Sequence, residues 1–223
     1  MKKSKSSTSH EGWEKYYRQS ETSAWKDETE AFLLENLEIV KPHEAEAPIL
    51  DVASGDGRNA FIWLKTGHAV CCNDISATAL QRLGKKVVGK SVVLLCGDFL
   101  KTELLPSQFG VVQCFDGVPQ MPDVQSAIQK MVDLTKPGGS IIFNLFTPQD
   151  VAFGEGEQVD ANTWIFKDTL FSFFNREDVE KLIPQNVNLI KCELKKWDDP
   201  PHGDFRPYTH THEAFFIILK KQS

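Results

Sequence analysis

The stretch ILDVASGDGRNA, residues 49–60, combines a short apolar strand, a turn with two glycines and the start of a helix. Glycine tolerates a positive φ and lets the backbone approach a ligand closely, so Gly55 and Gly57 predict a turn that contacts a small molecule. The helix that begins at about Arg58 offers free N–H groups and a positive dipole end to an anionic group. Taken alone, the pattern G-x-G-x-x-A also fits a nicotinamide-binding turn.

Strands and helices alternate around this stretch. We expect strands at 49–52, 69–72, 91–96, 111–115 and 140–146, with helices at 59–65, 75–88 and 124–134. Almost wholly apolar strands are covered on both faces, and helices between them make a sheet parallel. Two more strands, 187–197 and 213–220, have no helix between them and should pair antiparallel. The sequence predicts an α/β fold: a Rossmann-like, doubly wound, seven-stranded sheet of five parallel strands and a C-terminal antiparallel hairpin.

The rest of the chain is assigned to the same domain. We expect a mobile tail at 1–10 and one domain at 11–223, made of N-terminal helices at 11–45 and a core at 46–223. Within the N-terminal part, 11–37 has a helical pattern. Within the core, 147–168 is expected to be rich in loops and 176–182 to form a helix.

Composition excludes several classes of protein. The 223 residues include 25 Lys and Arg against 31 Asp and Glu, a net charge of −6, which disfavours binding to nucleic acid or an anionic membrane by bulk attraction. No apolar run approaches the roughly 20 residues of a membrane-spanning helix, and none follows the charged N-terminus. The cysteines are odd in number and lie in apolar segments, so we expect them reduced and buried in a cytoplasmic protein. They are Cys71, Cys72, Cys96, Cys114 and Cys192.

An acid lies at the end of each of the first three strands. Asp51 would repel a pyrophosphate and attract an ammonium group, which the methionine part of S-adenosylmethionine carries. Asp74 could accept hydrogen bonds from both ribose hydroxyls. Asp98 could accept from an adenine amine. Each acid singly could be a helix cap or loop acid, but together at consecutive strand ends they predict a ligand site.

The motifs resemble those of class I S-adenosylmethionine-dependent methyltransferases, from about Trp13 to the end of the chain. The matching segments are DVASGDGRNA, CCNDIS, GDF, FDGVPQMP and LTKPGGSIIFNLF. The opening WEKYYRQSETSAW is similar to small-molecule enzymes of the thiopurine and tellurite-resistance type, although Ala53 and Ser54 replace the more usual glycine and cysteine. The resemblance and the strand-end acids together assign these residues to S-adenosylmethionine: Trp13, Tyr17, Trp25, Asp51, Ser54, Gly55, Asp56, Gly57, Asp74, Ile75, Asp98, Phe99, Phe115 and Asp116.

Two of these assignments have alternatives. In the relatives an N-terminal helix closes over the cofactor, whereas Trp13 and Trp25 could instead anchor that helix in the core. Asp116 could contact the cofactor or the methyl acceptor, or cap the following helix.

The segment DDPPHGDFRPYTHTHE, residues 198–213, is the candidate acceptor side. It contributes the catalytic candidates His202, Arg206, His210 and His212. His210 and His212 alternate, so they face one way on an extended strand. Three interpretations remain open: a histidine base with the Arg206 guanidinium binding an anion, a metal site formed by the three histidines with Asp198, Asp199 or Asp204, and a loop held for structural reasons. The spacing matches no standard metal pattern, and we assign no metal ligand.

The expected function is methyl transfer from S-adenosylmethionine to a small molecule, with no nucleic-acid or membrane partner. The alternatives are a non-catalytic module that binds S-adenosylmethionine, a nicotinamide-dependent oxidoreductase, and a protein methyltransferase. Neither the acceptor atom nor the oligomeric state follows from the sequence.

Overall fold

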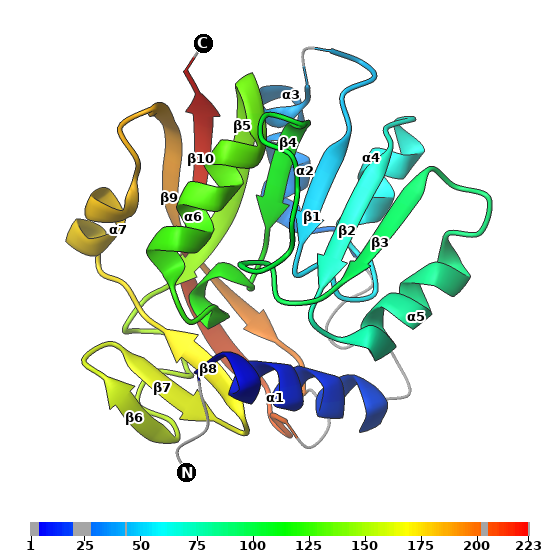
Figure 1. The fold of residues 1–223 in the computed structure, drawn as a ribbon. Helices are drawn as coiled ribbons and strands as arrows, with labels where there is room; N and C mark the ends of the chain where they lie inside the picture. The colour runs from blue at the N-terminus through cyan, green and yellow to red at the C-terminus, as the bar shows by residue number, and fades with distance from the viewer. Residues whose placement is uncertain (1–4, 20–27, 43, 202–204, 223) are drawn as a thin grey trace.

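A seven-stranded sheet forms the centre of the protein (Figure 1), in a computed structural model that describes residues 5–19, 28–42, 44–201 and 205–222. Its strands lie in the order β3, β2, β1, β4, β5, β10, β9. Their bounds are β3 Val92–Cys96, β2 Val70–Asp74, β1 Ile49–Val52, β4 Phe109–Cys114, β5 Thr135–Phe146, β10 His210–Lys221 and β9 Val187–Asp199. Two predicted site residues, Trp25 and His202, lie outside the described residues.

The pairing of the strands confirms the predicted fold class. Strands β1 to β5 are parallel, and β10 runs antiparallel to both β5 and β9. The chain moves outward from β1 to β3 and then returns to the other side of β1, where β4 pairs with it. This reversal leaves a crevice at the carboxyl ends of β1 and β4, where doubly wound sheets bind their ligands.

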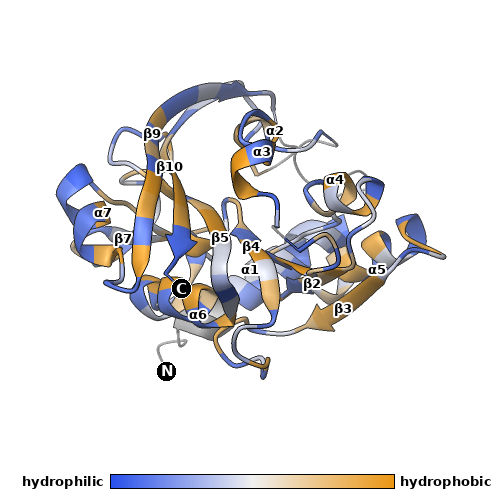
Figure 2. Cartoon of the chain, turned by 90° about the horizontal axis from the view of Figure 1, so that it is seen from above, coloured by the Kyte–Doolittle hydropathy of each residue, from blue (hydrophilic) through white to orange (hydrophobic). Residues whose placement is uncertain are grey.

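Side chains that alternate along each strand fill two cores, one on each face of the sheet. On β10, Phe216 and Ile218 join one core, whereas Phe215 and Ile217 join the other. One face is covered by α2 Ala31–Glu35, α3 Leu37–Val40, α4 Ala60–Lys65 and α5 Ala77–Lys86, and the other by α6 Val124–Leu134 and α7 Arg176–Leu182. Figure 2 shows apolar and polar residues on α4, α5 and α7, as expected of helices that bury one side. Each large apolar side chain buried in this way contributes about 1.5–3 kcal/mol.

The N-terminal helix α1, Lys5–Gln19, lies across the carboxyl ends of the strands (Figure 1), between α5 and a small second sheet. It begins inside the predicted tail 1–10. The helical pattern at 11–37 corresponds to α1, α2 and the start of α3, and residues 20–27 are among those the structure does not describe. The tail boundary was placed too late because the Ser- and Lys-rich start has no apolar periodicity.

The predicted loop-rich stretch at 147–168 is only partly loop, because its second half contributes two strands to a three-stranded antiparallel sheet. Its strands are β6 Glu157–Asp160, β7 Thr163–Phe166 and β8 Thr169–Ser172. The turn between β7 and β8 consists of Lys167 and Asp168, both with positive φ, at 48° and 59°. A two-residue hairpin turn needs positive φ at both positions and usually uses Asn-Gly or Asp-Gly, so Lys-Asp gave no signal.

The cysteines agree only in part with the expectation. All five are free, and Cys71, Cys72 and Cys114 are buried, but Cys96 is exposed and Cys192 is half-buried. Cys96 ends the edge strand β3, whose outer residues are not covered by a helix, so the apolar composition of that strand misled the prediction. None of the described helices is long and apolar enough to cross a membrane.

Candidate active site

A cleft at the carboxyl ends of β1, β2 and β4, here called the strand-end cleft, collects most of the predicted cofactor residues. It encloses about 1080 Å³, including the space at its mouth. The predicted residues that line it are Trp13, Tyr17, Ser54, Gly55, Asp56, Asp74, Ile75, Asp98, Phe99, Phe115 and Asp116. Asp51 and Gly57 do not line it. The structure thus brings together residues from five parts of the chain, while their contacts with a ligand stay a prediction.

The glycine turn forms the floor of this cleft. Gly55 has φ +56°, and a β-carbon there would lie 2.4 Å from the Tyr17 hydroxyl oxygen. Gly57 has φ +98°, and its β-carbon would lie 2.3 Å from Leu83 Cδ1. Both positions therefore require glycine, but for different reasons: Gly55 allows α1 to approach the turn, whereas Gly57 allows the turn to pack on α5.

Asp74 holds the turn and lines the cleft at the end of β2. Its carboxylate accepts hydrogen bonds from the backbone N–H groups of Gly55 and Ser76, both at 2.8 Å. Burial raises the pKa of Asp74 to about 6 against the effect of these bonds, and the nearby Glu14 raises it further. Ser76 is the N-cap of α5, and its side chain accepts a hydrogen bond from Ala79 N.

Asp51 and Ser54 carry buried polar atoms that the protein leaves unsatisfied. Asp51 is 1% exposed, and its Oδ2 has no hydrogen-bond partner, like Oγ of Ser54. Burial raises the pKa of Asp51 to about 7, against the lowering effects of Gln113 and Arg58. Neither Asp51 nor Asp74 forms an ion pair within the described part of the chain. A ligand that brings positive charge and hydrogen-bond donors fits this site, because buried carboxylates without a cation are unfavourable.

Asp51 predicts an unusual pH dependence of stability for the ligand-free protein. The folded state keeps the Asp51 proton up to about pH 7, whereas the unfolded chain releases it near 3.8. Between these values the folded state binds more protons, so the free energy of unfolding decreases as the pH rises, by a total on the order of a few kcal/mol. Urea unfolding at several pH values should show this decrease, and Asp51→Asn should reduce its slope. An equally steep decrease in the variant would contradict the assignment.

Helix α1 is fixed over the cleft by polar contacts at two points. The Glu14 carboxylate accepts from Ser76 Oγ and Thr78 Oγ1, both at 2.7 Å, at the start of α5. Burial opposes ionisation of Glu14, but these hydrogen bonds outweigh it and lower its pKa to about 2. Trp13 Nε1 donates to Gln120 Oε1 at 2.7 Å on the opposite side of the cleft. Trp13 lines the cleft, which fits its predicted role of covering the cofactor. Its hydrogen bond to Gln120 also holds α1 in place.

Asp98 and Phe99 lie where an adenine was predicted. Both line the strand-end cleft after β3. Asp98 is half-buried, accepts from Leu100 N at 3.0 Å and lies 3.3 Å from Lys101 Nζ. Phe99 is 4% exposed and carries Lys130 over its ring. The remaining acceptor capacity of the Asp98 carboxylate fits a contact with an exocyclic amine.

Asp116 is held rigidly in a strained conformation. Its φ is +60°, a region that non-glycine residues rarely occupy. Its N–H donates to Asn144 Oδ1 at 2.6 Å, Asn144 Nδ2 donates back to its Oδ1 at 2.7 Å, and Arg58 Nη2 lies 3.1 Å from its Oδ2. Arg58 also contacts Glu30 at 3.3 Å. The sequence singled out Asp116 but gave no sign of this network, because its members are distant along the chain.

A smaller cavity beside the β9–β10 hairpin, here called the hairpin cavity, adjoins the strand-end cleft. The two share Asp116 and Gln120. The hairpin cavity encloses about 360 Å³ and is lined by Asp116, Gln120, Phe146, Phe171, Trp197, Asp199, Phe205, Arg206, His210 and His212. Five of its lining residues come from the segment 198–213, the predicted acceptor side: Asp199, Phe205, Arg206, His210 and His212.

The catalytic candidates have different surroundings in this cavity. His210 and His212 are buried, and both line it. Arg206 also lines it, but Glu155 occupies its guanidinium fork through hydrogen bonds of 3.1 and 2.7 Å. That arrangement fits the structural interpretation for Arg206, since a substrate anion would have to displace Glu155.

Three further residues were missed by the sequence analysis as members of the site. Gln120 joins Trp13 to the backbone of Asp116, Glu14 fastens α1, and Asp150 contacts His212. Gln120 lies within the motif FDGVPQMP and could have been suspected, whereas Glu14 and Asp150 have no local signal.

Comparisons with known proteins agree with this geometry. Residues 50–143 match the family model described as a methyltransferase domain. These residues are a methyltransferase domain. The resemblance to class I S-adenosylmethionine-dependent methyltransferases, which the motifs suggested, is confirmed, and the family implies S-adenosylmethionine as the methyl donor.

The chain is also similar to a curated relative and to two solved structures. The chain is 27% identical over 159 residues to a ubiquinone biosynthesis O-methyltransferase of Pectobacterium carotovorum, and the match covers 68% of this chain and 60% of the relative. A S-adenosylmethionine-dependent methyltransferase from Anabaena variabilis has a TM-score of 0.67 at 16% identity, covering 96% of this chain and 95% of that one. TehB from Haemophilus influenzae has a TM-score of 0.67 at 13% identity, covering 93% and 66%. These structural likenesses support the fold of the whole chain.

Proposed function

We propose that the protein transfers a methyl group from S-adenosylmethionine to a small molecule held in the hairpin cavity. The observation that carries the proposal is the pair of buried carboxylates, Asp51 and Asp74, beside the glycine turn, neither of which forms an ion pair with another described residue. S-adenosylmethionine has a sulfonium and an ammonium group, whereas a nicotinamide dinucleotide would bring a pyrophosphate to the same turn. The charge of the site favours the first and disfavours the second.

The residues divide into a donor side and an acceptor side. Asp74 would hold the ribose hydroxyls, Asp98 the adenine amine, and the turn at Ser54 and Gly55 the methionine end. The bound cofactor supplies an activated methyl group on its sulfonium. The chain positions the acceptor and excludes water, and α1 helps to exclude water because it covers the cleft.

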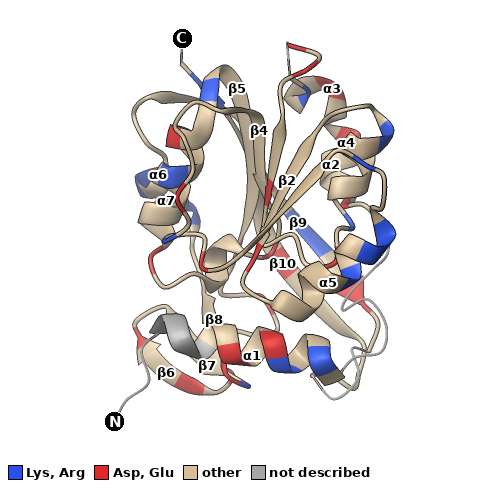
Figure 3. Ribbon diagram, turned by 45° about the vertical axis from the view of Figure 1, so that its right-hand side comes forward, with Lys and Arg blue, Asp and Glu red and all other residues tan. Residues whose placement is uncertain are grey.

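The aromatic walls of the hairpin cavity support a small, largely apolar or aromatic acceptor. Phe146, Phe171, Trp197 and Phe205 provide these walls. The curated relatives named as O-methyltransferases support a hydroxyl as the acceptor group, although the chain spans about three fifths of their length. Figure 3 shows Lys and Arg spread over several elements with acidic residues among them. The net charge of −6 disfavours a nucleic-acid partner held by bulk attraction. The free cysteines fit the reducing cytoplasm.

Two measurements test the proposal and separate it from its alternatives. Calorimetric titration should show binding of S-adenosylmethionine and S-adenosylhomocysteine and none of NAD⁺ or NADP⁺, and the reverse result would favour the oxidoreductase. Incubation with S-adenosylmethionine labelled on its methyl group, together with a metabolite extract, should transfer label to a small molecule. Binding without transfer to any acceptor would favour a cofactor-sensing module, and label on proteins alone would favour a protein methyltransferase.

A further inference from the structure

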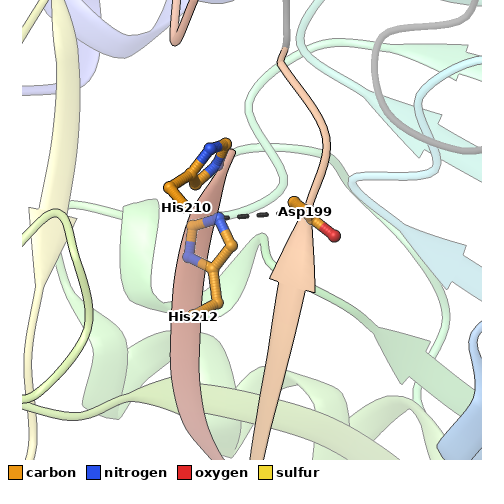
Figure 4. A group of neighbouring side chains, drawn as sticks. All are labelled: Asp199, His210 and His212. Carbon is orange, nitrogen blue, oxygen red and sulfur yellow. Dashed lines mark ion pairs between the residues drawn. The ribbon is translucent and has the colours of Figure 1, made fainter. Parts of the chain in front are cut away.

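The register of the β9–β10 hairpin brings two histidines and an aspartate onto one face. Asp199 pairs directly with His210, and His212 lies two residues further along β10. Directly paired residues point to the same side of a sheet, as do residues two apart on a strand. All three are buried, at 2%, 5% and 8% exposed. Figure 4 shows His210 and His212 on β10 beside Asp199 at the end of β9.

Ligand atoms of these residues converge. One nitrogen from each histidine and one carboxylate oxygen all lie within 4.8 Å of one another. His212 Nε2 is 3.9 Å from Asp199 Oδ2. Ligands of a four-coordinate zinc ion bind at about 2.0–2.2 Å, so a shift of less than about 1 Å per side chain would bring the three atoms into coordination distance.

The other ring nitrogen of each histidine is already held by an acceptor. His212 Nδ1 lies 2.8 Å from Asp150 Oδ2, and His210 Nδ1 lies 2.8 Å from the carbonyl oxygen of Tyr208. An acceptor at Nδ1 places the proton there and leaves the lone pair of the neutral ring on Nε2. Histidines that bind metals are oriented in this way by a carboxylate or a backbone carbonyl. Asp150 is itself fixed by hydrogen bonds from Ala152 N and Glu213 N.

We propose that Asp199, His210 and His212 bind a divalent transition-metal ion, with zinc as the best match, and leave a coordination position open to the hairpin cavity. Two imidazoles and a carboxylate suit zinc and its first-row neighbours, whereas magnesium and calcium prefer oxygen ligands only. Three protein ligands with one open position are typical of catalytic zinc sites. The sequence analysis assigned no metal ligand, because the spacing of 199, 210 and 212 becomes meaningful only through the hairpin register.

The position of the site gives the ion a role toward the acceptor, and this step rests on the proposed function. The hairpin cavity meets the strand-end cleft at Asp116 and Gln120. An acceptor hydroxyl or thiol that coordinates the ion in the open position would have a lowered pKa, since a bound cation favours the deprotonated group. The acceptor class is therefore a small molecule with a ligating hydroxyl or thiol.

The test begins with the full-length protein after dialysis against a chelator. Titration with zinc sulfate against a chromophoric competitor should show one ion per chain, with Kd on the order of 1 µM or tighter. Cobalt titration should add visible absorption bands from the bound ion. Asp150→Asn should weaken zinc binding about 10- to 100-fold, because it frees the orientation of His212. His210→Ala, His212→Ala and Asp199→Asn should weaken it more.

Control variants distinguish a loss of metal binding from a loss of folding or of cofactor binding. His68→Ala removes a histidine held by the Ala47 carbonyl oxygen at the other end of the sheet, and should leave zinc affinity unchanged. Asp199→Asn conserves the side-chain volume, so it tests metal binding even if a histidine variant fails to fold. All variants should retain S-adenosylhomocysteine binding. Absence of zinc binding below about 100 µM, or zinc binding that these three substitutions do not weaken, would overturn the inference. Zinc binding without cofactor binding would instead overturn the proposed function alone.

Discussion

Replacing Asp74 with alanine is expected to weaken binding of S-adenosylmethionine by about 5- to 150-fold, the equivalent of roughly 1–3 kcal/mol. The substitution removes the acceptor for the ribose hydroxyls and also the two hydrogen bonds that fix Gly55 N and Ser76 N. Calorimetric titration of the variant would measure the loss. Unchanged affinity would remove the ribose assignment.

The conservative variant separates the two effects of Asp74. Asn keeps a carbonyl oxygen for one backbone N–H but loses the charge and one acceptor. Asp74→Asn should therefore keep most of its stability and still lose affinity for the cofactor. Asp178→Asn, at the start of α7 and away from the strand-end cleft, should leave cofactor affinity unchanged. If the Asn variant lost stability and affinity in proportion, Asp74 would be a turn residue only.

The core of the fold could be predicted from the sequence because the patterns that indicate its strands and turns are local. The apolar runs at 49–52 and 111–115 and the glycine turn each specify their own segment, and doubly wound topology then places Asp51, Asp74 and Asp98 at neighbouring strand ends. The same logic failed for β6, β7 and β8, where strands of four residues and an unusual Lys-Asp turn give little pattern. It also gave no warning that Cys96 lies on an uncovered edge strand.

The sequence pointed to the segment 198–213 as the acceptor side, but it did not show which residues from other parts of the chain lie beside that segment. The histidines of the segment 198–213 were visible, but which residues face them depends on the β9–β10 register and on the path of 147–156. Asp150 reaches His212 from 62 residues away, and Glu155 reaches Arg206 from 51. Such pairs are set by tertiary packing, so the sequence could not show that Glu155 contacts Arg206 or that Asp199 lies beside His210.

Replacing Asp116 with alanine is expected to reduce kcat on the order of 100-fold while cofactor affinity changes less. Asp116 is shared by the strand-end cleft and the hairpin cavity, so it lies where donor and acceptor must meet. Its carboxylate ties Arg58 and Asn144 together, and displacement of a positioning group by about 1 Å can cost a factor of 10². Single-turnover measurements with labelled cofactor would measure the methyl-transfer step directly.

Two variants distinguish the side chain of Asp116 from its strained backbone. Alanine at φ +60° keeps an unfavourable conformation, at a cost of about 1 kcal/mol, whereas glycine adopts it freely. Asp116→Gly should therefore be more stable than Asp116→Ala and equally slow, because both lack the carboxylate that holds Arg58. Asp116→Asn tolerates the same φ and keeps one acceptor oxygen, so its rate should lie between those of glycine and the parent. Recovery of full activity in the glycine variant would show that backbone conformation, and not the carboxylate, aligns the two cavities.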